Sequence, residues 1–238
     1  MQIKISSAEE FERLLNALCE EVVNACIHFR LYSDLEAARD QYSTSYQQSW
    51  TFWSLTFQAH LDTALFRLCK IYDQHDASLN LRNLLDTIEA NLGVFDTKNF
   101  KERLKGNPFV DSLAKDAKRP SVDDLKRDKD TVSDVDPTVK ALLFWRNNFF
   151  SHRSAKHVVE KKDLADHYAL EMKAVESLSK NALRIVNHYS HLFRASHYSI
   201  QMVGHKDFEY ILKTIDEVVR ANEAKIDREL EESQRRNS

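Results

Sequence analysis

The chain has 238 residues, a net charge of −3 and only three glycines and three prolines. Sheets need Gly and Pro in their many turns, and nucleotide-binding α/β folds need glycine-rich loops. The composition therefore argues against both and predicts an all-α protein. A chain of this length buries roughly 70% of its unfolded surface, so it needs no disulfide or metal to hold a core.

The cysteines and the hydropathy of the sequence indicate where in the cell the protein is expected. Cys19, Cys26 and Cys69 are an odd number with no repeating spacing, which argues against a disulfide framework or a zinc module. Cys26 and Cys69 fall within apolar stripes and are expected in the core. No stretch approaches the ~20 apolar residues of a membrane span, and the first residues lack an apolar signal core. We expect a soluble, cytoplasmic protein without a membrane partner.

The first predicted helix covers residues 7 to about 31, where apolar residues recur at steps of three and four. Capping boxes, a Ser followed three residues later by a Glu, stand at 7–10 and at 33–36. The second box predicts a new helix start at residue 33.

The strongest helical pattern runs from about residue 42 to 72 and includes Trp50 and Phe52. It is apolar over so wide an arc that it predicts the central, most buried helix. A shorter helix is expected over 79–93, with Gly93 as its C-terminal cap.

Residues 94–134 carry alternating charges and turn residues, which predict an irregular, charged excursion of short surface helices and loops. Asp136 followed by Pro137 is typical of a helix start. Further helices are expected over 163–195 and 207–232. No repeat or linker separates two domains, so we predict one helical domain over residues 1–238.

The stretch FWRNNFFSHRS, residues 144–154, places Arg146 and His152 near a helix end. Between residues 140 and 162 there are six Lys or Arg and one acid, so this segment is locally basic. A guanidinium can clamp a phosphate, and an imidazole can move a proton near neutral pH. On RNA the 2′-hydroxyl supplies the nucleophile, so this chemistry needs no metal or other cofactor.

The spacing of this pair is weak support by itself, because about two such Arg–His spacings arise by chance in this composition. Arg184 and His191 form a second one, but they lie within a long periodic helix. On an ideal helix Arg146 and His152 would lie about 120° and about 9 Å apart. A symmetric dimer could bring two such pairs together, which favours a composite site between two copies.

The stretch RNNFFSHR resembles the Arg-polar-x-His signature of the HEPN superfamily. The stretch FWSLTFQAHLDTALFRLCKIYDQH is similar to the long second helix of its AbiU-like, abortive-infection branch, which ends in a run matched here by Leu68, Ile71, Tyr72 and Asp73. The stretch ALRIVNHYSHLF resembles a late helix of that branch. The resemblance covers about residues 10–195.

This resemblance implies a metal-independent endoribonuclease that acts as a homodimer in antiphage defence or as a toxin, with an antitoxin or defence protein as a possible partner. Arg146 and His152 would be the catalytic pair, and Asn147 would orient them. The sequence departs from the family in having the large Phe149 and Phe150 before Ser151. The alternative is a noncatalytic HEPN module that binds RNA, a nucleotide or a protein partner.

The basic residues after the motif have two interpretations. Arg153, Lys156 and Lys161 could follow an RNA backbone or form a solvated basic loop. Asn147 and Ser151, one turn apart, are expected to form local hydrogen bonds, and Ser151 is also a candidate for the supporting shell of the Arg146 site.

A second polar set contains Arg67, Tyr72 and Asp73, which could form structural ion pairs or a supporting shell around Arg146. Arg67 is expected to pair with Asp73 or with a carboxylate on another helix. No Asp or Cys stands at ligand spacing beside the late histidines, so we predict no metal site at His188, His191 and His197.

Overall fold

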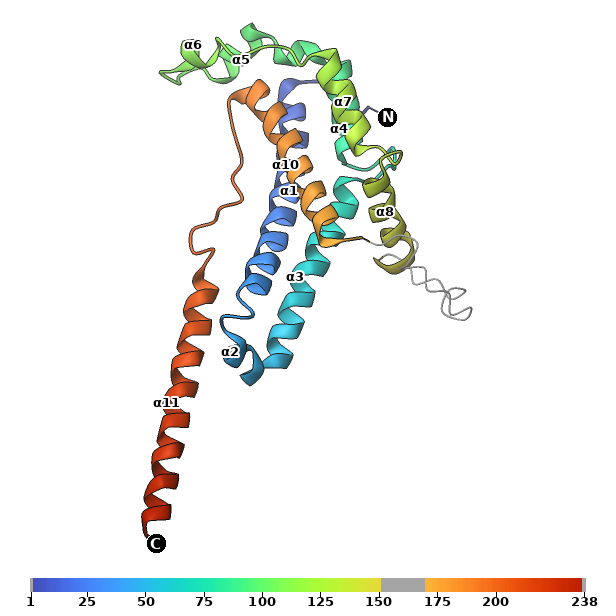
Figure 1. The fold of residues 1–238 in the computed structure, drawn as a ribbon. Helices are drawn as coiled ribbons and strands as arrows, with labels where there is room; N and C mark the ends of the chain where they lie inside the picture. Colours follow the sequence, from blue (N-terminus) through green and yellow to red (C-terminus); the bar gives the residue numbers. More distant parts are fainter. Residues whose placement is uncertain (1, 151–169, 237–238) are drawn as a thin grey trace. The chain divides into compact units, whose positions relative to one another are not determined.

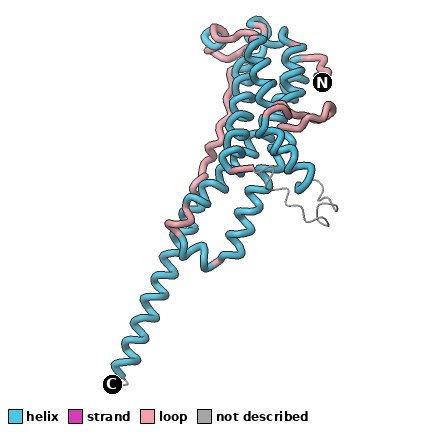
Figure 2. The backbone as a smooth tube through the Cα atoms, turned by 45° about the vertical axis from the view of Figure 1, so that its right-hand side comes forward, coloured by secondary structure: helices cyan, strands magenta, loops and turns pink. Residues whose placement is uncertain are grey.

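The computed structural model describes residues 2–150 and 170–236, in which the chain forms helices and loops and no strand (Figure 2). The fold class is therefore all-α, as the scarcity of Gly and Pro predicts. The helices are α1 (Ala8–Ala37), α2 (Ser43–Gln48), α3 (Trp50–Ile71), α4 (Leu81–Ala90), η1 (Leu92–Phe95), α5 (Thr97–Arg103), α6 (Val110–Leu113), α7 (Val122–Val132), α8 (Pro137–Trp145), the π-helix η2 (Arg146–Phe150), α10 (Met172–Arg194) and α11 (Asp207–Arg236).

The chain forms two compact units, and α1 and α3 contribute residues to both. Unit 1 comprises Met1–Ile27 with Thr63–Ile200, and unit 2 comprises His28–Asp62 with Gln201–Ser238. The single domain over residues 1–238 stays a prediction.

In unit 1, α1 and α10 lie along each other in opposite directions (Figure 1). Cys26 near the end of this part of α1 contacts the carbonyl of Ser179, and Glu12 near the start of α1 pairs with Arg194 at the end of α10. Both faces are apolar, and each large buried side chain contributes about 1.5–3 kcal/mol to folding. All three cysteines are free and buried, which confirms the core positions of Cys26 and Cys69.

The charged excursion over 94–134 forms short helices and loops as predicted, but it is more than a surface feature. Helices α4 and α7 lie side by side (Figure 1), and Lys129 of α7 pairs with Asp86 of α4 at 2.7 Å. The segment also buries apolar side chains in unit 1, among them Phe95, Phe100, Leu125 and Val132. Most of its polar residues are exposed, but Asp128 is fully buried together with these apolar side chains.

In unit 2, α2 and α11 close a separate apolar core. This core is made of Leu35, Tyr46, Trp53, Phe57 and Leu212. The Ser45 hydroxyl donates to the Leu212 carbonyl at 2.7 Å, and the Tyr46 hydroxyl donates to the Leu35 carbonyl at 2.8 Å. These two bonds tie α2 to α11 and to α1.

The helix start predicted at residue 33 is wrong. Helix α1 continues through it, because the Ser33 hydroxyl donates to the Phe29 carbonyl one turn earlier instead of capping a new helix. At the true start of α1 the Ser7 hydroxyl accepts from the Glu10 amide, and the Glu10 carboxylate accepts from the Ser6 amide.

The single helix predicted over 42–72 is interrupted at Ser49, between α2 and α3. Trp50 and Phe52 are 46% and 62% exposed, so the first turn of α3 is not the buried centre that its apolar pattern suggests. The pattern combined two different environments, since α3 belongs to unit 1 only from Thr63 onward.

Helix ends differ from the prediction at several places. Helix α1 runs to Ala37, past its predicted end near residue 31, and α10 begins at Met172, so residues 170 and 171 do not belong to the helix predicted over 163–195. Helix α4 ends at Ala90 with Asn91 as its C-cap, and Gly93 lies within η1 instead of capping α4. Helix α11 extends to Arg236, four residues beyond its predicted end. Within the described ranges, no helix is long and apolar enough to cross a membrane.

Candidate functional site

Arg146 lies where an ordinary α-helix changes into a π-helix. Helix α8 begins as the sequence predicts, with Pro137 at its first position and the Asp136 carboxylate accepting from the amides of Thr138 and Val139. After Trp145 the chain widens into the π-helix η2, which starts at Arg146. π-Helical turns occur mostly as short irregularities, frequently at functional sites. The helix therefore loosens at Arg146.

The Arg146 guanidinium forms an ion pair with Asp73, which follows the end of α3. The Arg146 Nη1 donates to Asp73 Oδ1. The two side chains are only 27% and 20% exposed, so the pair is partly shielded from water. Burial by itself raises the pKa of Asp73, but hydrogen bonds from Arg146 and Ser78, the guanidinium charge and the Gln74 amide together hold that pKa below its usual value.

The loop that carries Asp73 is held by a dense set of hydrogen bonds. Asp73 Oδ1 accepts from the Gln74 amide at 2.8 Å, and Asp73 Oδ2 accepts from the Ser78 hydroxyl at 3.0 Å. The buried Asn83 amide donates to three carbonyls of the same loop, those of His75, Asp76 and Ser78. The carboxylate that faces Arg146 is thus fixed by its own loop before any ligand arrives.

Asn147 and Asn148 bond locally within the π-helical turn. The Asn147 Oδ1 accepts from the Arg146 Nε at 3.0 Å, and the Asn148 side-chain amide donates to the Phe144 carbonyl at 2.8 Å. Asn147 and Asp73 therefore hold two different nitrogens of the same guanidinium. The Asn147 bond is local, and the orienting role that the resemblance implies for Asn147 stays a prediction.

The other candidates of the supporting shell contact different parts of unit 1. The Tyr72 hydroxyl donates to the Leu178 carbonyl of α10 at 2.8 Å, and burial strongly raises the pKa of Tyr72. Arg67 pairs with Glu21 of α1 at 2.7 Å, which is the ion pair with another helix that the sequence left open. Of the three candidates, Asp73 bonds Arg146 directly, whereas Tyr72 and Arg67 bond α10 and α1.

Several predicted site residues lie outside the described residues. They are Ser151, His152, Arg153, Lys156 and Lys161. Their proposed roles stay predictions.

The second Arg–His spacing, at Arg184, forms a structural network. Arg184 Nη2 donates at 2.7 Å to Asp128, whose side chain is fully buried, and Asp128 also accepts from the Tyr189 hydroxyl at 2.9 Å. His191 bonds His197 across 3.1 Å. Among the residues whose positions are known, no group of three His, Cys, Asp or Glu side chains could hold a metal ion.

The sequence reasoning missed the residues that organise the Asp73 loop. Gln74, Ser78 and Asn83 were not singled out, although the polar run DQHDASLN over 73–80 signals a turn rich in side-chain-to-backbone bonds. Only their contacts show that this turn fixes one carboxylate.

A scan against protein-family models finds HEPN_AbiU2, described as AbiU2, over residues 8–211. This match covers most of the chain, including both α3 and the π-helical turn. A search of curated proteins and a search of solved structures give no match.

Proposed function

We propose that this chain, which belongs to the AbiU2 family of HEPN proteins, is a metal-independent endoribonuclease that acts in antiphage defence or as a toxin. The family relates the chain to abortive infection. The nuclease activity is the proposal, and one contact carries it: Asp73 bonds Arg146. That bond joins the two stretches, the IYD end of α3 and RNNFFSH, that resemble the family separately.

Arg146 suits the task of holding a scissile phosphate. A guanidinium has five N–H donors in a planar fork, and within the described residues two of them are used, one by Asp73 and one by Asn147. The remaining donors can bind phosphate oxygens and stabilise charge that develops on them. Because Asp73 and Asn147 fix the fork beforehand, little ordering is needed when RNA binds.

In the proposed mechanism His152 takes the proton of the 2′-hydroxyl, which then attacks the adjacent phosphorus. The same imidazole, now protonated, gives its proton to the leaving 5′-oxygen. The products carry a 2′,3′-cyclic phosphate and a free 5′-hydroxyl. We propose that two copies of the chain form one composite site, with Arg146 from both copies on the phosphate.

A second candidate is a noncatalytic HEPN module that binds RNA, a nucleotide or a protein partner. The same contact favours it, because an arginine already paired with a carboxylate at a helix end can be a purely structural element. Binding without cleavage would then depend mainly on the basic residues, with a strong dependence on salt.

The test is incubation of labelled RNA with the purified protein in excess EDTA. Wild type should cleave and leave 2′,3′-cyclic ends, while Arg146→Ala and His152→Ala should lose cleavage by at least ~100-fold and stay folded. Arg82→Ala is the matched control, because Arg82 is exposed and bonds Gln74 on the same loop. Intact RNA with the folded wild type, across substrates and pH, would favour the noncatalytic module.

A further inference from the structure

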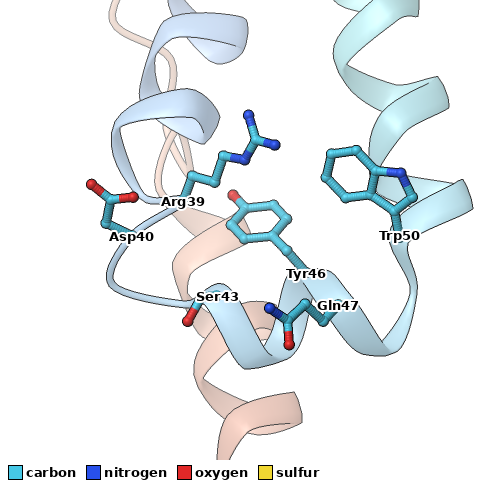
Figure 3. Close-up of a pocket in the computed structure, with 6 residues that line it drawn as sticks. All are labelled: Arg39, Asp40, Ser43, Tyr46, Gln47 and Trp50. Atoms are coloured by element: carbon cyan, nitrogen blue, oxygen red, sulfur yellow. The ribbon is translucent and has the colours of Figure 1, made fainter.

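Unit 2 has an open pocket that the proposed nuclease site does not use. Its volume is about 360 Å³, within the range of small-molecule pockets. It is lined by Arg39, Asp40, Ser43, Tyr46, Gln47 and Trp50 (Figure 3). All six come from one short stretch, residues 39–50, so a single local segment builds the pocket.

Helix α2 supplies one wall of the pocket. Ser43, Tyr46 and Gln47 follow steps of three and four residues along α2, which place them on one helical face, whereas Trp50 begins α3 beyond the break at Ser49. The hydroxyl of Tyr46 is bonded to the Leu35 carbonyl, so this residue presents its ring to the pocket while its polar end is engaged elsewhere. Tyr46 therefore belongs both to the pocket lining and to the apolar core of unit 2.

The pocket offers planar surfaces to a ligand. The Trp50 indole is 46% exposed, and the Arg39 guanidinium lies over its ring at 5.1 Å from the centroid. In Figure 3 the Arg39 side chain extends in the direction of Trp50, and the hydroxyl end of the Tyr46 ring points toward Arg39. Both an indole and a guanidinium plane stack with nucleobases.

The polar groups of the pocket are suited to a neutral ligand that both donates and accepts hydrogen bonds. Over the ranges that the structure describes, the Asp40 carboxylate, the Ser43 hydroxyl and the Gln47 amide have no side-chain hydrogen bond or ion pair. Arg39 has an ion pair with Glu36 at 3.7 Å, which offsets part of its charge. With Asp40 also at the pocket, the local charge gives a phosphate little attraction.

We propose that this pocket binds a nucleobase, a purine in preference to a pyrimidine, stacked on Trp50 and hydrogen-bonded on its edge by Gln47. A purine has the larger ring system and so the larger stacking area, and a glutamine amide can donate to and accept from a purine edge at once. The base could belong to a free nucleotide or to single-stranded RNA. This site is separate from Arg146 and does not depend on cleavage.

The first arm of the test measures binding of AMP, GMP, CMP and UMP, and of adenosine, to the full chain by titration calorimetry. The two purine nucleotides should bind at least about threefold more tightly than the pyrimidines, because stacking dominates. Adenosine should bind within about threefold of AMP, because the phosphate adds little. Equal affinity for all four nucleotides, or loss of binding when the phosphate is removed, as in adenosine, would overturn the proposal.

The second arm uses matched variants. Trp50→Ala should raise the Kd for AMP about tenfold or more, whereas Phe52→Ala, on the same helix and outside the pocket, should change it less than twofold. Gln47→Ala should weaken binding, while the neighbouring Gln48→Ala should not. Unchanged affinity in Trp50→Ala would refute the assignment. Trp50 and Gln47 are both solvent-accessible, so neither variant should unfold unit 2.

The third arm separates the two sources of the base. A short oligoribonucleotide that binds far more tightly than AMP, and loses this gain when one nucleotide is abasic, identifies RNA as the source. Equal affinity for AMP and the oligonucleotide identifies a free nucleotide. Binding of AMP should persist in Arg146→Ala, so failure of the nuclease proposal and failure of this one are distinguishable.

Discussion

Two arginines in this protein are followed by a histidine at similar spacing, and they differ in their local helix and in the carboxylate that they bond. Arg184 lies within the regular helix α10 and bonds Asp128, which is fully buried and also bonded by Tyr189. Arg146 lies at the first residue of a π-helix and bonds Asp73, which sits on a loop and stays partly exposed.

The comparison shows that the carboxylate partner, and not the Arg–His spacing, separates a structural arginine from a candidate functional one. A fully buried carboxylate needs its arginine, because an unpaired charge in the core is very costly. A partly exposed carboxylate held by its own loop keeps other partners, so it depends less on its arginine. The two sites should therefore fail in different ways when they are mutated.

The largest expected effect is on stability at Arg184. Arg184→Ala leaves the Asp128 carboxylate buried with Tyr189 as its remaining bonded partner, and should lower the free energy of unfolding by about 3 kcal/mol. Arg146→Ala should cost clearly less, since Asp73 keeps its bonds from Ser78 and Gln74. Urea denaturation of both variants measures the difference. An equal loss in both would break the comparison.

The next effect concerns activity at Asp73. Asp73→Asn keeps the size of the side chain but weakens its hold on the Arg146 guanidinium, so the cleavage rate should fall about 10- to 100-fold. Because Asp73 acts through Arg146, the same substitution should change little in the Arg146→Ala background. Single-turnover rates and KM for the single and double variants test this. A rise in KM at unchanged kcat would assign Asp73 to RNA binding instead.

A smaller effect is expected on the pH dependence of stability, through His188 beside the Arg184 network. Burial lowers the pKa of His188. The positive charges of Arg184 and Arg127 lower this pKa further, whereas the carboxylates of Asp128 and Asp124 each raise it by a smaller amount than burial lowers it. Since the pKa is lower in the folded state, the stability from neutral His188 is present above the unfolded value of ~6.5. It is lost as the pH falls from there through the folded pKa. In His188→Gln the unfolding midpoint should fall less between pH 7 and 5, and an unchanged slope would contradict the assignment.

The smallest effect is expected at the Arg67–Glu21 pair. Both side chains are about one-third exposed, so Glu21→Gln should cost at most ~1 kcal/mol of stability. It should leave RNA cleavage unchanged, because this pair bonds α3 to α1 and does not contact Arg146. Denaturant midpoints and cleavage rates of this variant check both statements. A loss of cleavage comparable to that of Asp73→Asn would place Arg67 in the supporting shell.

Much of the local structure could be predicted from the residues. The start of α8 followed from Asp136 and Pro137, and the start of α11 was placed correctly at Asp207. The helix start predicted at Ser33 was wrong, because a serine within a helix can bond the preceding turn instead of capping a new helix. The burial predicted around Trp50 was also wrong, since an apolar pattern does not state whether a neighbouring element covers it.

The sequence by itself determined the helical class, because so few Gly and Pro leave little besides helices, and it identified the Arg146 stretch through its resemblance to a family. Only the tertiary structure decided which carboxylate faces that arginine. Asp73 and Arg146 are 73 residues apart, and periodicity describes one helix at a time. Their pairing depends on how the end of α3 packs beside α8, which is set by the summed burial of many side chains.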